Sequence, residues 1–279
     1  MSLHPFDAAL QLQPQADGSY LGATSPAWAN MVGPFGGITA ATVVHAIVGH
    51  DKCLGDPVSL TVNYVAPIAD GAFRLVLRIA RTNRSTQHWV FEFEQTGADG
   101  GVQCVLTGTA MTAAYRETWG ANDLPMPQVP PAHMLPQAVV PQSVEWLTRY
   151  DMRTVTGGLP QLWDRSESTL PPDEASLSQL WVRDRADRAL DYAALAAVAD
   201  IFFPRVWVRR AHWTAAGTVG MTVYFHADSA LLAQVGSGYL LAQARGQVFR
   251  KGFFDQSGCL WSEAGVPLAT THQLMYFRD

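Results

Sequence analysis

Charged residues are scarce in this chain of 279 residues. They make up 15% of the sequence, against 48% for hydrophobic residues, whereas about one quarter of an average soluble domain is charged. Because disordered chains are polar and highly charged, this composition excludes a disordered protein. Long apolar runs are also missing: the stretch 189–203 is interrupted by Asp191 and Asp200, and a membrane-spanning helix needs about 20 apolar residues. The sequence predicts a globular protein whose apolar residues form a core, a subunit interface or a pocket for an apolar ligand.

Basic residues and cysteines are few as well. The net charge is −5, and Lys52 and Lys251 are the only lysines, so we expect no nucleic-acid partner. An anion would have to be bound by arginine, histidine or backbone N–H groups. The three cysteines lie far apart, outside any metal-ligand spacing, which predicts neither a disulfide nor a metal site. The N-terminal residues lack the basic and apolar regions of a secretory signal, so we expect a cytoplasmic protein without a cofactor.

A proline-rich segment divides the chain. Six prolines lie between Pro125 and Pro141, and proline fixes φ and removes a backbone donor. We therefore expect an irregular linker over 119–145 between two units, 1–118 and 146–279.

The two units repeat one pattern. Each has a helix rich in small apolar residues, predicted over 37–49 and 190–201, followed by runs of β-branched and aromatic residues separated by Gly, Asp and Asn. The predicted strands are 58–65, 73–81, 87–95 and 102–112 in the first unit, and 219–226, 239–249, 254–261 and 267–277 in the second. This repeat predicts an α+β fold with an antiparallel sheet wrapped around a central helix in each unit.

Glycines precede the first predicted helix. Gly33, Gly36 and Gly37 stand where free N–H groups at a helix start attract an anion or an oxyanion. The loop matches neither a Walker A motif nor GxGxxG, and taken alone the glycines are better explained by tight packing of the helix against the sheet.

Asp200 is the acidic residue with the most apolar surroundings. It ends the second predicted helix and precedes Ile201, Phe202 and Phe203. A carboxylate among apolar residues is costly unless it is paired, and a negative charge at a helix C-terminus opposes the helix dipole. A general base, or a group that holds a water molecule, would justify this position.

Polar residues also occur in two late strands. Gln273 interrupts the otherwise apolar end of strand 267–277. In the preceding segment, alternation predicts that one face carries Thr214, Thr218, Thr222, Tyr224 and His226. Each of these residues alone is also compatible with simple packing.

Common catalytic motifs are absent from the sequence. The histidines, among them His45, His88, His226 and His272, form no HxH or HxxxH pair, and no GxSxG motif occurs. This excludes the usual signatures of a zinc hydrolase and of a serine hydrolase.

Four segments together resemble the acyl-CoA thioesterase II family, the double-hotdog thioesterases. They are Phe35-Gly36-Gly37 at the first helix, RTNRS at 81–85, ADIFF at 199–203 and LWSEAGVPLATTHQ at 260–273. The last segment has the most specific spacing, and the resemblance extends over about residues 15–115 and 150–279. It implies two fused hotdog units, each a curved antiparallel sheet around a helix.

The resemblance also implies an Asp, a Thr or Ser, and a Gln that together hold a water molecule for attack on a thioester. Asp200 and Gln273 match the motif positions. The Phe-His pair at 225–226 selects Thr218 as the hydroxyl, with Thr222 as the alternative. Members of the family carry a histidine shortly before Phe-Gly-Gly, whereas this sequence has Val-Gly-Pro at 32–34.

Substrate contacts follow from the same resemblance. The oxyanion would face the N–H groups of Gly36 and Gly37, and the phosphates of CoA would meet Arg81 and Arg84. The acyl chain would lie along Phe35, Ile201, Phe202 and Tyr224. The expected function is hydrolysis of acyl-CoA in fatty acid metabolism by a homodimer or larger homo-oligomer. The alternatives are a hotdog protein that binds acyl-CoA or acyl carrier protein without turnover, and a hotdog enoyl hydratase or dehydratase.

Overall fold

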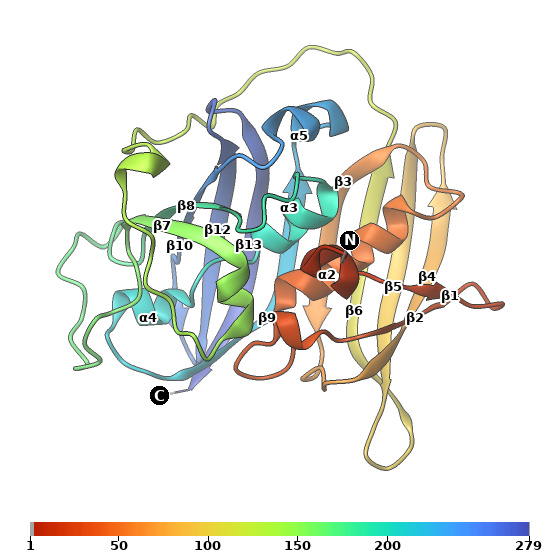
Figure 1. Cartoon of the computed structure of the whole chain (residues 1–279), viewed down its shortest axis with the longest axis horizontal. Helices are drawn as coiled ribbons and strands as arrows, with labels where there is room; N and C mark the ends of the chain where they lie inside the picture. Colours follow the sequence, from red (N-terminus) through yellow and green to blue (C-terminus); the bar gives the residue numbers. More distant parts are fainter. Residues whose placement is uncertain (1–2, 279) are drawn as a thin grey trace.

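The strands of the protein form one continuous antiparallel sheet that curls around two buried helices (Figure 1). The computed structural model describes residues 3–278. Within them, no helix has both the length and the apolar character needed to cross a bilayer.

The first half contributes the longer central helix. It consists of α1 (Pro5–Ala9), β1 (Gln13–Pro14), β2 (Tyr20–Ala23), η1 (Pro26–Trp28), α2 (Gly36–Val48), β3 (Asp56–Tyr64), β4 (Ala72–Thr82), β5 (Thr86–Thr96) and β6 (Val102–Ala113). Helix α2 is buried along almost its whole length, because the small and β-branched residues that form it let other backbone approach closely.

The second half also has a central helix and a set of antiparallel strands, together with additional short helices and strands. It consists of η2 (Ala132–Met134), η3 (Glu145–Arg149), β7 (Tyr150–Thr156), β8 (Ser178–Asp184), α3 (Tyr192–Val198), α4 (Arg205–Arg209), β9 (Ala215–Phe225), α5 (Ser229–Val235), β10 (Leu240–Arg245), β11 (Phe249–Arg250), β12 (Phe253–Ser262) and β13 (Pro267–Arg278).

Strands β3 and β9 join the two halves at the centre of the sheet. They pair from Ser59 opposite Tyr224 to Asn63 opposite Gly220. Outward from this seam the strand order is β6-β5-β4-β2 on one side and β13-β12-β10-β8 on the other, so the two halves repeat each other. The predicted α+β double hotdog is confirmed.

Several predicted elements differ in extent. The second helix was expected over 190–201, but α3 ends at Val198, which leaves Asp200 in the following turn. The strand expected over 239–249 is divided into β10 and β11, because the Asp255 carboxylate accepts hydrogen bonds from the backbone of Gln247 and Val248. Strands β7 and β8 were not predicted.

The proline-rich segment lies across the outer face of the second half. The indole N–H of Trp181 donates to the carbonyl of Pro130, and that of Trp261 donates to the carbonyl of Leu124. The segment therefore covers apolar surface of β8 and β12 in addition to connecting the two halves.

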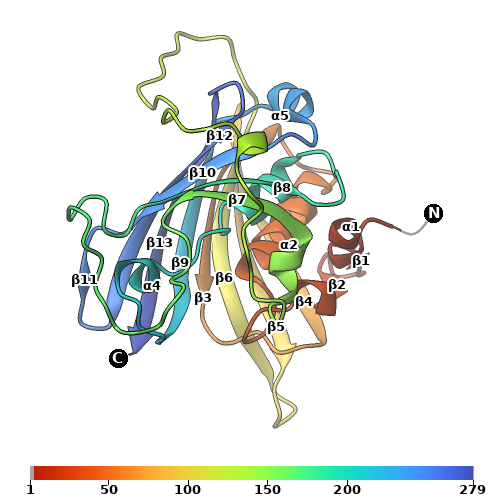
Figure 2. The ribbon, with the colours of Figure 1, turned by 60° about the vertical axis from the view of Figure 1, so that its left-hand side comes forward.

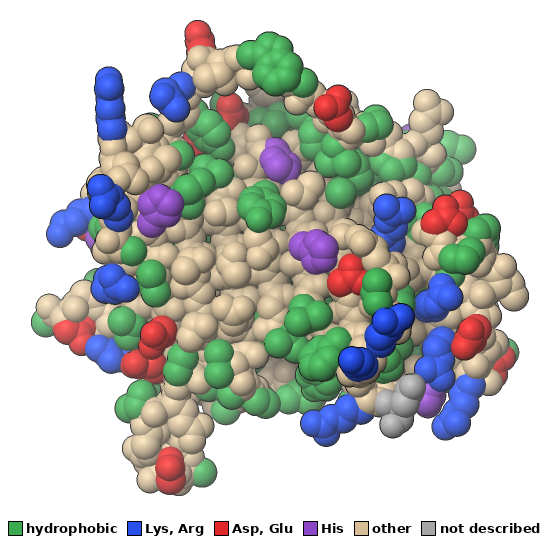
Figure 3. Space-filling model, turned by 180° about the vertical axis from the view of Figure 1, so that it is seen from behind, with side chains coloured by type: hydrophobic (Ala, Val, Ile, Leu, Met, Phe, Trp, Pro, Cys, Tyr) green, Lys and Arg blue, Asp and Glu red, His purple; other side chains and the backbone are tan. Residues whose placement is uncertain are grey.

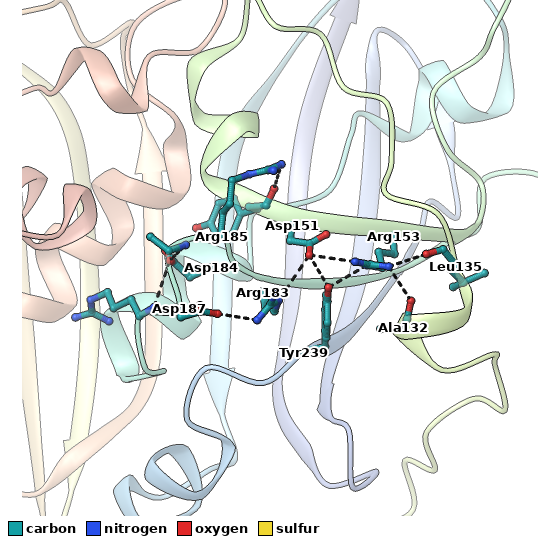
Figure 4. A network of polar contacts seen from close by, with 12 residues as sticks. Ala132, Leu135, Asp151, Arg153, Arg183, Asp184, Arg185, Asp187 and Tyr239 are labelled. Atoms are coloured by element: carbon teal, nitrogen blue, oxygen red, sulfur yellow. Dashed lines mark hydrogen bonds and ion pairs between the residues drawn. The ribbon is translucent and has the colours of Figure 1, made fainter.

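An ionic network holds the same segment in place (Figure 4). Arg153 donates to the carbonyls of Ala132 and Leu135 and to the hydroxyl of Tyr239. Tyr239 donates in turn to Asp151 at 2.5 Å. Burial opposes ionisation of Asp151, but the hydrogen bonds from Tyr239 and Arg153 lower the pKa of Asp151, which keeps the carboxylate charged against the arginine.

Helices α2 and α3 cross at a glycine. A Cβ atom on Gly37 would stand 2.5 Å from the carbonyl oxygen of Ala197 in α3 and 2.4 Å from the ring of Phe35. Only glycine fits this crossing, and the crossing brings the end of α3 against the start of α2. Figure 2 shows both helices on the concave side of the sheet.

We expect Gly37→Ala to lower the free energy of unfolding by about 1–3 kcal/mol, because the new methyl group meets rigid backbone. This clash outweighs the better helix propensity of alanine. The control is Gly120→Ala, since a Cβ on Gly120 meets nothing within 4 Å. Urea denaturation of the two variants checks the prediction, and equal midpoints would contradict it.

Candidate active site

The carboxylate of Asp200 lies at the N-terminus of α2. Phe35, the residue before this helix, makes no capping hydrogen bond with its side chain. The backbone N–H of Gly37 instead hydrogen-bonds to Asp200. One oxygen of Asp200, Oδ2, would be 2.7 Å from a Cβ atom on Gly36, so glycine is required here for the carboxylate to approach. Asp200 thus caps a helix in the other half of the chain.

Gln273 holds the other oxygen of Asp200. Its Nε2 donates to Oδ1 of Asp200 at 2.8 Å, and its side chain is only 2% exposed on the concave face of β13. Burial raises the pKa of Asp200 to about 7, while the hydrogen bonds from Gln273 and Gly37 limit the rise. At neutral pH the carboxyl group can therefore both accept and release a proton.

Gln256 fixes the orientation of Gln273. The two residues pair across β12 and β13, and Nε2 of Gln256 donates to Oε1 of Gln273 at 3.0 Å. Because the Gln273 oxygen is engaged in this way, its amide nitrogen must face Asp200. Gln256 is 0% exposed, and sequence analysis missed it. In the sequence Gln256 stands between Asp255 and Ser257, so no apolar context marked it as a site residue.

Tyr64 is a second site residue that sequence analysis missed. Its hydroxyl donates to the carbonyl of Gly36 at 2.8 Å. Burial and the charge of Asp200 raise the pKa of Tyr64 well above its usual value, so the tyrosine remains a donor. Tyr64 is the last residue of β3, and this hydrogen bond ties β3 to the first residue of α2.

The two candidate threonines lie on opposite faces of the sheet. The register of β9 and β13 shifts between Leu274 and Met275, so Thr218 lies opposite Met275, whose side chain shares the concave face with Gln273. Thr222 lies opposite exposed His272. The predicted common face for these threonines is therefore wrong, because the shift reverses the alternation. Within residues 3–278, the structure gives no hydrogen bond between Thr218 and Asp200.

Thr222 and Tyr224 lie on the convex face of the sheet, on the opposite side from Asp200. Thr222 hydrogen-bonds Thr61 at 3.0 Å across the seam, and Tyr224 is 51% exposed on the same convex side. The sheet therefore lies between Tyr224 and Asp200, and the structure does not bring these two predicted site residues together.

Arg81 and Arg84 are also not brought to the site. They flank the turn between β4 and β5, where Gln87 hydrogen-bonds the backbone of Lys52 and Leu54 just beyond the C-terminal end of α2. Asp200 lies at the N-terminal end of this helix of 13 residues, which is about 20 Å long. The structure does not support a role for either arginine beside Asp200.

Aromatic residues flank the site. Phe35 stacks on Trp146 with the ring centroids 4.0 Å apart. Phe202 is buried, and its ring fills the space that a side chain at Gly258 would occupy. No cluster of three His, Cys, Asp or Glu side chains in residues 3–278 is arranged to hold a metal ion.

Both halves of the chain match domains of one protein family. Residues 24–113 match the acyl-CoA thioesterase N-terminal domain, and residues 123–277 match the acyl-CoA thioesterase C-terminal domain. The chain belongs to the acyl-CoA thioesterase family. No functionally curated protein sequence matches it.

Solved structures extend the comparison for this thioesterase family member. A protein of unknown function with a hot dog fold from Alicyclobacillus acidocaldarius is 39% identical over 100% of this chain and 99% of its own, with a TM-score of 0.89. An acyl-CoA thioesterase II from Mycobacterium marinum is 17% identical over 98% of both chains, with a TM-score of 0.73. The dehydratase domain of RzxB from Pseudomonas fluorescens is 12% identical over 99% of this chain and 100% of its own, with a TM-score of 0.59. The last two likenesses show the fold alone.

We expect Gln256→Met to raise the pKa of Asp200 further, because Gln273 would lose the contact that directs its amide toward the carboxylate. Any reaction that needs ionised Asp200 would then shift its acid limb to higher pH. The pH dependence of activity checks this, with Gln243→Met in neighbouring β10 as the control. A loss of stability with an unchanged pH midpoint would show a merely structural role.

Proposed function

We propose that this protein hydrolyses acyl-CoA thioesters with Asp200 as the general base. The main support for the proposal is the raised pKa of the buried Asp200 carboxyl group. Its value of about 7 suits proton transfer near neutral pH. A buried amide orients it, and the chain belongs to a thioesterase family.

The proposed reaction begins with a water molecule held between the free side of the Asp200 carboxylate and Thr218. The water oxygen attacks the thioester carbonyl while Asp200 takes the proton. The C–S bond then breaks, and the proton passes from Asp200 to the departing CoA thiolate. The water molecule is the only reactant besides the thioester, and its proton ends on the CoA thiol.

The proposed oxyanion site has one backbone N–H donor, whereas the sequence suggests two. The N–H of Gly37 already hydrogen-bonds to Asp200, which leaves the N–H of Gly36 at the positive end of α2 to stabilise the developing negative charge. The acyl chain would contact Phe35, Ile201 and Phe202, which are buried beside Asp200. A hydrolysis screen over short, medium, long and aromatic acyl-CoAs would identify the preferred chain.

We expect Asp200→Asn to lower kcat/KM at least about 100-fold, because an amide cannot accept the proton. In the unmodified protein, activity should fall below about pH 7, since the raised pKa means that the base is protonated there. A DTNB-coupled assay from pH 5 to 9 measures both effects. Asp70→Asn in an exposed turn is the control, and a near-normal rate for Asp200→Asn would refute the role of Asp200.

The same raised pKa has a consequence for stability. Between pH 4 and 7 the folded protein holds a proton on Asp200 that the unfolded chain releases, so this group stabilises the fold less as the pH rises through this range.

We further infer that two copies of the chain pair through the convex face of the sheet. The centre of this face carries few charged side chains (Figure 3), and the large exposed residues Tyr224, Leu274 and Tyr276 lie on it. A face with few charged residues and exposed aromatic residues is typical of the core of an interface.

Light scattering at micromolar concentration should therefore give at least a dimer, and Tyr224→Arg should shift the equilibrium toward monomer by placing a charge in the contact. Lys52→Arg leaves the face unchanged and serves as the control. A monomeric unmodified protein would contradict the inference.

A further inference from the structure

The hydroxyl of Tyr64 lies beside the carboxylate of Asp200, above the first residue of α2. A Cβ atom on Gly36 would lie 2.7 Å from Oδ2 of Asp200 and 2.9 Å from the hydroxyl oxygen of Tyr64. Because residue 36 is a glycine, it places no side chain in the space that both oxygens border. One water molecule can bridge two oxygens placed in this way, since each O–H···O hydrogen bond spans about 2.7–2.8 Å.

The facing atoms of Tyr64 and Asp200 are both hydrogen-bond acceptors. The hydroxyl proton of Tyr64 is donated to the carbonyl of Gly36 at 2.8 Å, so its oxygen presents lone pairs to its other neighbours. An ionised carboxylate also only accepts, and within residues 3–278 the structure gives no hydrogen bond between Tyr64 and Asp200. Two acceptors that border one space are stabilised by a donor between them, and a water molecule supplies two O–H groups.

Strands from both halves hold these two oxygens in place. Tyr64 ends β3, and alternation along this strand puts its side chain on the same face as buried Leu60 and Val62. Asp200 is oriented through its other oxygen, Oδ1, by Gln273 on β13. The position of a bridging water molecule is therefore fixed by the sheet on both sides of the β3–β9 seam.

The residues that border this position keep contact with solvent. Tyr64, Gly36 and Asp200 are each partly exposed, whereas Gln273 and Gln256 behind the carboxylate are buried. A water molecule that donates one proton to each oxygen keeps a lone pair directed away from both acceptors. A thioester carbonyl that enters from the exposed side would meet this lone pair.

We propose that Tyr64 is a catalytic residue that accepts a hydrogen bond from the attacking water molecule while this water donates its other proton to Asp200. The proposal rests on the proposed function, in which Asp200 takes a proton from the same water. As the new C–O bond forms, the proton directed at Asp200 passes to the carboxylate. The proton directed at Tyr64 stays on the oxygen and becomes the hydroxyl proton of the tetrahedral intermediate, so Tyr64 neither gains nor loses a proton. The hydroxyl of Thr218 would act on this water as a donor.

We expect Tyr64→Phe to lower kcat for acyl-CoA hydrolysis at least about tenfold with an unchanged KM, because the water molecule loses one of its two acceptors. The matched control is Tyr192→Phe. The Tyr192 hydroxyl also donates to a backbone carbonyl, that of Ala227 at 3.0 Å, but Tyr192 lies at the opposite end of α3 from Asp200. Urea denaturation should show similar shifts for the two variants, whereas only Tyr64→Phe should lose activity. Equal losses of kcat in the two variants would overturn the proposal.

The pH profile separates a contact with the water molecule from an effect on the carboxyl group. The pKa of Asp200 is set by burial and by the hydrogen bonds from Gln273 and Gly37. The acid limb of the Tyr64→Phe profile should therefore keep the midpoint of the unmodified protein. A shifted midpoint would show that Tyr64 acts through the ionisation of Asp200, and the proposal would then be wrong.

A crystal structure of the unmodified protein tests the same position without any catalysis. It should show a water molecule within hydrogen-bond distance of both the Tyr64 hydroxyl and Oδ2 of Asp200, and the crystal structure of Tyr64→Phe should lack this water. An unoccupied position in the unmodified protein would overturn the role of Tyr64, whether or not acyl-CoA is hydrolysed. If the water is present but no acyl-CoA is hydrolysed, the proposed function fails, and the catalytic role of Tyr64 with it, while the water site stands.

Discussion

The close crossing of α2 and α3 is the contact on which the candidate site depends. Gly37 leaves room for the carbonyl of Ala197, and Gly36 leaves room for the carboxylate of Asp200. A larger residue at either position would separate the helices and remove the carboxylate from the N-terminus of α2. The glycines are therefore required for packing, and the packing creates the electrostatic setting of the acid.

Two effects act in opposite directions on the ionisation of Asp200. As a helix cap it gains from being ionised at the positive end of α2, whereas burial favours its protonated form. The balance places its pKa near neutrality. Gln273 and Gln256 form a short chain of amides behind it, so that the carboxylate is oriented by buried groups on rigid strands and not by a flexible loop.

The sequence predicts local features of the molecule better than relations across the sheet. Asp200 and Gln273 could be identified because each is a polar residue in an apolar context and the family motif covers both. The faces of Thr218 and Thr222 could not, because the shift of register in β9 leaves no mark on residue alternation. Arg81 and Arg84 lie at the turn between two predicted strands, and the sequence does not reveal which end of the first helix this turn approaches.

The seam between β3 and β9 makes the two halves mechanically inseparable. Backbone hydrogen bonds cross it directly, and neither half could leave without exposing an unpaired strand edge in the middle of the sheet, an edge prone to aggregate. A hinge between the halves would have to break the pairing of β3 with β9. Any widening of the space around Asp200 would then involve the helices and loops on the concave side, because the strands on both sides of the seam are paired.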